Sequence, residues 1–152
     1  LYTEGNSQVL DTENINLLVN ASTQNSLQLA EAIRQGNGEK ALRLVAELLV
    51  RNEPALKIVA TLVGQFRTWT AIKVCLEAGE KDEKAIATAA DLANPKRLYF
   101  LRKELQSITG KQLLACLHLL LALEFQLKRG SEPLSCLQTK VLELCHVFNG
   151  HH

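Results

Sequence analysis

Apolar residues recur along this chain with the spacing of α-helices rather than the alternation of strands. The segments 38–51 and 133–148 each have a single apolar stripe, which predicts amphipathic helices. The first stripe consists of Ala41, Leu44, Val45, Leu48 and Leu49. The second consists of Leu134, Leu137, Val141, Leu144 and Phe148. The segment 54–78 is apolar on more than one side, which is typical of a central helix, and 111–129 is predicted as a second central helix.

Capping residues and glycines predict where the remaining helices begin and end. Asp82 and Asn94 stand at N-cap positions, and Thr109 with Gln112 has the spacing of a capping box that opens the second central helix. Gly36 follows a helix end in the position that favours a left-handed residue. We therefore expect an all-α fold, a helical bundle of about eight helices joined by short turns. The shorter predicted helices are 11–19, 25–35, 83–90 and 95–107.

A polar stretch at residues 21–24 predicts a boundary between two parts of the chain. We interpret residues 1–21 as the end of a preceding domain, 24–148 as the helical domain and 149–152 as a disordered tail. The sequence begins with Leu1 and contains no methionine, so we expect a fragment of a longer protein. His151 and His152 are interpreted as the remnant of a purification tag.

Composition and charge indicate a soluble, cytoplasmic domain. The hydrophobic fraction is 47%, the net charge is +1, and nucleic-acid binding along the whole length would require a more basic chain. The run 113–127 is interrupted by polar residues, so no membrane span is predicted. Four cysteines, Cys75, Cys116, Cys136 and Cys145, lack the C-x-x-C spacing of metal or redox sites. They are interpreted as small core residues in a reducing compartment.

Candidate catalytic residues are few. No glycine loop of the form G-x-x-x-x-G-K-[ST] is present, and Gly64 lies inside a predicted helix, where we expect a neighbouring backbone to approach closely. Outside the terminal pair the histidines are His118 and His146, and a helical enzyme would need one of them beside an acid in a deep pocket. The acids between Glu77 and Glu83 are interpreted as caps and solvated charges. We therefore expect no catalytic site, cofactor or metal.

The most basic segment lies in the predicted helix 95–107. It contains Lys96, Arg97, Arg102 and Lys103. Together with the preceding short helix, residues 82–107 resemble a helix-turn-helix unit, whose second helix would present its early residues to a major groove. The alternative function is thus a DNA-binding helical domain, although Tyr99 and Phe100 compete with the basic residues for the exposed face.

The order of several short motifs resembles the C-terminal domain of DNA polymerase III subunit delta. The stretch NSLQLAEAIRQGN at 25–37 is similar to the start of that domain. It is followed by Gln65, Phe66 and Arg67 in a proline-started helix, by an Ile-Ala helix at Ile86, and by a helix starting at Pro95. The motif EFQLKRG at 124–130 ends the leucine-rich helix.

This resemblance implies a clamp-loader collar domain without an ATP site of its own. The segment 11–19 would be the last helix of a lid-like middle domain, and an absent N-terminal part would contact the sliding clamp. The collar would bind other clamp-loader subunits, which makes protein contact its role in DNA replication. As interface residues we expect Gln65, Phe66, Arg67 and Trp69, together with the stripe of the last helix.

Overall fold

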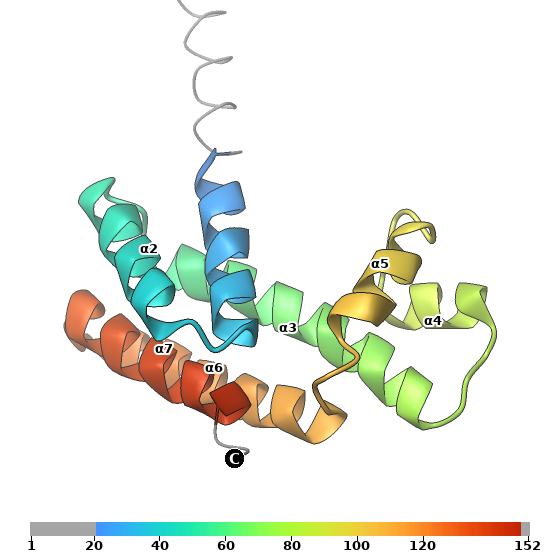
Figure 1. The fold of residues 1–152 in the computed structure, drawn as a ribbon. Coiled ribbons are helices and arrows are strands. Elements are labelled where there is room, and N and C mark those ends of the chain that lie inside the picture. The colour runs from blue at the N-terminus through green and yellow to red at the C-terminus, as the bar shows by residue number, and fades with distance from the viewer. Residues whose placement is uncertain (1–20, 150–152) are drawn as a thin grey trace, which may run out of the picture.

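The computed structural model describes residues 21–149, which form seven helices and no strand (Figure 1). This confirms the predicted all-α class. A first helix spans residues 21–34, and the predicted helix 11–19 lies outside the described residues. The others are α2 (Gly38–Val50), α3 (Ala55–Glu77), α4 (Glu83–Ala89), α5 (Arg97–Glu104), α6 (Gly110–Lys128) and α7 (Pro133–Asn149). No helix among these residues is long and apolar enough to cross a bilayer.

Two of the three predicted N-caps are present, whereas α5 has Lys96 at its N-cap position in place of Asn94, whose side chain accepts from the Lys96 amide at 3.0 Å. Asp82 accepts a hydrogen bond from the Lys84 amide at 3.1 Å at the start of α4, and Thr109 and Gln112 form the capping box of α6. Glu77, at the end of α3, also caps the start of α6. The Gly110 amide donates to both carboxylate oxygens of Glu77 at 3.2 Å. Gly36 has a φ of +71°, as its position after a helix end predicts.

The helix boundaries differ most from the prediction at the first helix and at α5, which begins at Arg97. Residues 21–24 are helical, so the polar stretch there is not a linker between helices. The domain boundary at this place stays a prediction. The helix α5 ends at Glu104, three residues earlier than expected. The Glu104 carbonyl accepts from Arg34 at 3.0 Å and the Leu105 carbonyl accepts from Lys73 at 2.8 Å. Cations from two other helices thus bind the carbonyls at this helix end.

The core lies around α3. Figure 1 shows helix 21–34 and α2 near the half of α3 where that helix begins, while α6 runs along α3 and α7 packs against both α2 and α6. Phe66 and Trp69 of α3 are fully buried and meet edge to face at 5.0 Å between ring centroids. Each such side chain contributes about 1.5–3 kcal/mol by burial. Most of the last stripe is also buried, but Leu134 is exposed.

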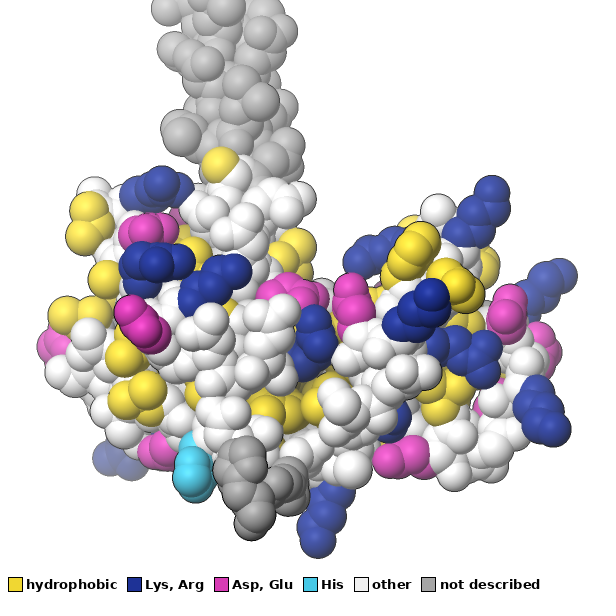
Figure 2. Space-filling model, viewed as in Figure 1, with side chains coloured by type: hydrophobic (Ala, Val, Ile, Leu, Met, Phe, Trp, Pro, Cys, Tyr) yellow, Lys and Arg dark blue, Asp and Glu magenta, His cyan; other side chains and the backbone are white. Residues whose placement is uncertain are grey.

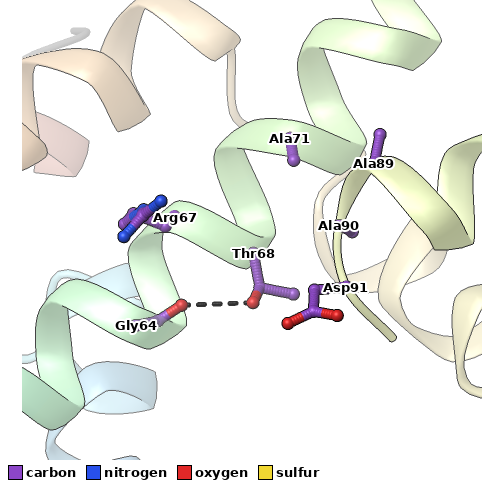
Figure 3. Close-up of a pocket in the computed structure, with 7 residues that line it drawn as sticks. All are labelled: Gly64, Arg67, Thr68, Ala71, Ala89, Ala90 and Asp91. Atoms are coloured by element: carbon purple, nitrogen blue, oxygen red, sulfur yellow. Dashed lines mark hydrogen bonds between the residues drawn. The ribbon is translucent and has the colours of Figure 1, made fainter. Parts of the chain in front are cut away.

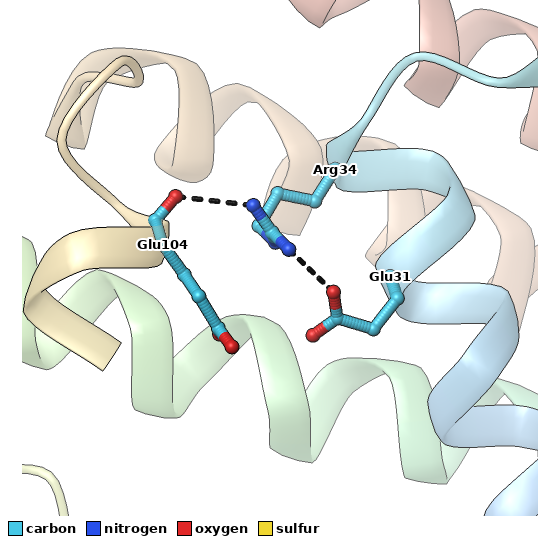
Figure 4. A network of polar contacts seen from close by, with 3 residues as sticks. All are labelled: Glu31, Arg34 and Glu104. Carbon is cyan, nitrogen blue, oxygen red and sulfur yellow. Dashed lines mark hydrogen bonds and ion pairs between the residues drawn. The ribbon is translucent and has the colours of Figure 1, made fainter. Parts of the chain in front are cut away.

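The helices α4 and α5 form a lobe at the other half of α3 (Figure 1). Ile86, Leu98 and Leu101 bury its apolar side. Arg34 connects the lobe to the rest of the bundle, because it donates to the Glu104 carbonyl and forms an ion pair with Glu31 (Figure 4). The lobe is therefore held by its packing against α3 and by a charged hydrogen bond from helix 21–34.

Candidate interaction surfaces

One cleft of about 320 Å³ lies between α3 and α4 (Figure 3). Its lining consists of Gly64, Arg67, Thr68, Ala71, Ala89, Ala90 and Asp91. The Thr68 hydroxyl donates to the Gly64 carbonyl at 3.1 Å and is thus engaged within its own helix. The lining offers one cation, Arg67, and one carboxylate, Asp91, and contains no histidine or cysteine.

Gly64 does not have the internal role expected for it. A Cβ built at this position meets no atom within 4 Å beyond the neighbouring backbone of its own helix. The prediction that another backbone approaches closely at Gly64 is therefore wrong within the described residues. The glycine lowers helix propensity without improving packing in this chain.

The histidines and cysteines do not assemble into a reactive group. His118 on α6 and His146 on α7 are both exposed, and neither lines the cleft. Among residues 21–149 no three or more His, Cys, Asp or Glu side chains lie together as metal ligands. Burial raises the pKa of the Cys116 thiol to about 12 and that of Cys145 to about 11, so both are neutral core side chains, as predicted. Cys75 and Cys136 are half-buried at the edge of the core.

The residues predicted as a subunit interface on α3 divide between core and surface. Phe66 and Trp69 have no exposed surface, so they belong to the core and cannot contact a partner directly. Their aromatic character reflects the packing of a central helix rather than recognition. Gln65 is half-buried and Arg67 is exposed beside the cleft, and an interface through these two residues stays a prediction.

An apolar surface lies on the exposed side of α6. Leu114, His118, Leu121 and Phe125 follow one another at intervals of four, three and four residues, which is the spacing of a coiled-coil seam. Leu121 is 58% exposed and Phe125 is 61% exposed. We call these four residues the α6 seam. Sequence analysis missed the seam because α6 is apolar on both sides, and periodicity alone does not say which side is buried.

Basic side chains flank the α6 seam. Lys111 lies at its start, and the Arg129 guanidinium lies 5.3 Å from the centroid of the Phe125 ring at its end. The acid nearest to the seam in sequence, Glu124, is paired with Lys128 at 3.2 Å. The seam is therefore an apolar stripe with positive ends.

The four basic residues predicted to contact nucleic acid occupy different surroundings on α5. Arg102 forms an ion pair with Glu83 of α4 at 3.7 Å, and Arg97 lines a shallow groove beside helix 21–34. Lys96 and Lys103 are exposed and lie one heptad apart, hence on one face. The nucleic-acid contact remains a prediction, and the structure brings only two of its four residues to the outward face of α5.

Two aromatic side chains share that face with Lys96 and Lys103. Tyr99 is 59% exposed and Phe100 is 64% exposed, and their rings meet edge to face at 5.4 Å. The Lys103 ammonium lies 4.4 Å from the centroid of the Tyr99 ring. Figure 2 shows this end of the molecule as hydrophobic side chains surrounded by Lys and Arg. We call Lys96, Tyr99, Phe100 and Lys103 the α5 patch.

Comparisons with known proteins identify the family. No curated protein matches the sequence of this chain. The DNA clamp loader delta protein of Bacillus subtilis has a similar fold, with a TM-score of 0.67 and 24% sequence identity. The match covers 82% of this chain and 36% of that protein. The family model of the DNA polymerase III delta subunit, C-terminal domain, matches residues 23–144, so the chain belongs to this family.

Proposed function

We propose that this chain is the collar module of a clamp loader and that the α6 seam contacts a neighbouring subunit. The observation that carries the proposal is the seam itself, in which Leu121 and Phe125 are both more than half exposed on a well-capped helix. Contiguous apolar surface of this kind commonly marks a protein interaction site. The coiled-coil spacing favours an amphipathic helix as the structure that covers it.

Family membership supports the identity of the partner. The delta family supplies a subunit of DNA polymerase III, and the matched clamp loader protein extends well beyond the region that this chain covers. We infer that other clamp-loader subunits bind this module through their own collar domains, in the cytoplasm. Contact with the sliding clamp, which is placed on DNA for replication, would belong to a part of the protein outside this chain.

The proposal assigns assembly rather than catalysis to this module. The cleft beside α3 lacks a nucleophile–base pair, and the two most buried thiols are neutral. The free energy that the module supplies would come from covering the α6 seam and its rim of basic residues.

The experiment is titration of this chain with collar domains of the other clamp-loader subunits by calorimetry. We expect association at micromolar concentrations, and a loss of at least about 100-fold in affinity for Leu121→Asp, because the charge would be desolvated at the centre of the seam. Leu56→Asp is the matched control, since Leu56 is an exposed leucine in the first turn of α3, where an acid suits the helix dipole. Equal losses for both variants, or no association of the unaltered chain, would contradict the proposal.

A further inference from the structure

We propose that the α5 patch binds single-stranded nucleic acid, with bases stacked on Tyr99 and Phe100 and phosphates bound by Lys96 and Lys103. This inference goes beyond assembly and uses a different helix from the α6 seam. It depends on the surface geometry of α5 and stands or falls independently of any subunit contact.

The aromatic rings supply the first part of the argument. The inward side of α5 is already filled by Leu98 and Leu101, which are buried, whereas Tyr99 and Phe100 point away from the core. Among the described residues the two rings contact each other, and Lys103 lies over Tyr99. Exposed rings of this kind are stacking platforms, because every base has a π-face that can lie on them.

The lysines supply the second part. Lys96 and Lys103 lie on the same face as the two rings, and the Lys103 ammonium is held 4.4 Å from the Tyr99 centroid, where a phosphate beside a stacked base could reach it. Glu83 of the neighbouring helix α4 is paired with Arg102 at 3.7 Å. Glu104 lies at the end of α5, next to Lys103. The net charge of Lys96, Lys103 and Glu104 together is positive.

The surroundings favour a single strand over a duplex. A recognition helix in a major groove presents hydrogen-bonding side chains to the edges of paired bases. The outward face of α5 presents Tyr99 and Phe100 instead, and such rings reach the faces of bases only where the bases are unpaired. The helix has 8 residues, or about 12 Å, which suits a contact with a few nucleotides.

The lobe is also fixed in position. Arg34 and Lys73 bind the last carbonyls of α5 from helix 21–34 and α3, at 3.0 and 2.8 Å. The rings therefore form a preorganised platform relative to the bundle, which lowers the entropy lost when a strand binds.

The test is fluorescence anisotropy at low salt with the whole chain and four labelled probes: an oligothymidylate, an oligouridylate, a duplex of equal length and an acidic peptide. We expect the single strands to bind at least tenfold more tightly than the duplex and the peptide. Comparison of the first two probes tells whether DNA or RNA is preferred, and either preference supports the proposal.

Variants assign the binding to the patch. Tyr99→Ala and Phe100→Ala should each weaken single-strand binding by about tenfold, and Lys103→Ala should weaken it less but flatten its salt dependence. Phe125→Ala is the matched control, because Phe125 is an equally exposed ring beside a cation on α6. Circular dichroism verifies that the variants stay helical.

Four outcomes would overturn the inference. These are absence of single-strand binding at low salt, tighter binding to the duplex, tighter binding to the acidic peptide, and unchanged affinity in the Tyr99→Ala, Phe100→Ala double variant. The duplex result would restore a helix-turn-helix role for residues 82–107, and the peptide result would assign the patch to a protein partner.

Discussion

The α6 seam and the α5 patch each contain an aromatic ring beside a cation, but the residues around this pair differ. In each, an exposed aromatic ring lies beside a cation, Phe125 with Arg129 at 5.3 Å and Tyr99 with Lys103 at 4.4 Å. In the α6 seam the ring follows Leu114, His118 and Leu121, whereas in the α5 patch it lies between Lys96 and Lys103. The comparison teaches that the neighbours of such an aromatic–cation pair decide which kind of contact we propose for it, protein on α6 and nucleic acid on α5.

The strongest way to break the comparison is to remove the core on which both surfaces depend. Phe66→Ala is expected to lower the free energy of unfolding by about 3–5 kcal/mol, because Phe66 is fully buried between the helices. Urea denaturation measures this loss. Both surfaces should then lose their binding together near the melting temperature of the variant. An unchanged free energy of unfolding would contradict the assignment of Phe66 to the core.

The two surfaces should separate when a single ring is removed from each. Phe125→Ala is expected to weaken subunit association by about 2 kcal/mol and to leave single-strand binding unchanged. Phe100→Ala should show the opposite pattern, because Phe100 lies on the α4–α5 lobe. Calorimetry and anisotropy on both variants measure this. If either variant impaired both activities, the seam and the patch would not be independent surfaces.

The link between the lobe and the bundle is expected to break when Arg34 is shortened. Arg34→Ala removes the hydrogen bond to the Glu104 carbonyl and should cost about 1.5 kcal/mol, mainly as local opening of α5. Hydrogen exchange should become faster in α4 and α5 but not in α6. Arg43→Ala serves as the control, since Arg43 is an exposed arginine on α2. Equal protection of α5 in both variants would rule out this role for Arg34.

High pH should loosen the bundle before the lobe. Burial raises the pKa of the Cys116 thiol from 9.0 to about 12, so the folded chain holds this proton more tightly than the unfolded chain. The resulting stability is complete below pH 9 and is lost as the pH rises toward 12. Between pH 8 and 10 the loss is expected to be about 1 kcal/mol. Melting curves measure it, and Cys116→Ala should show a flatter dependence on pH.

The smallest expected effect is a gain. Gly64→Ala should stabilise α3 by about 0.5–1 kcal/mol, because the added Cβ meets no atom within 4 Å and the helix loses an unfavourable residue. Thermal melting tests this value. If the variant also keeps its affinity for collar partners, the cleft between α3 and α4 is not part of the interface.

Local signals in the sequence predicted most of the helices and their ends. Two examples are the capping box at Thr109 and Gln112 and the N-cap at Asp82. Both act within a few residues, so they could be predicted without knowing the fold. The end of α5 could not be predicted in this way, because Arg34 and Lys73 bind its last carbonyls from helices that are distant in sequence. The order of short motifs was also sufficient to indicate the family that the comparisons confirm.

The chain by itself therefore determined the helical class, the family and the pairing of apolar and capping residues that starts each helix. The tertiary structure decided which side of each apolar helix is covered. It buried Phe66 and Trp69, left Leu121 and Phe125 exposed, and separated Arg97 and Arg102 from the two lysines. The physical reason is that periodicity defines the angle between residues on one helix, whereas burial depends on which other helices pack against it.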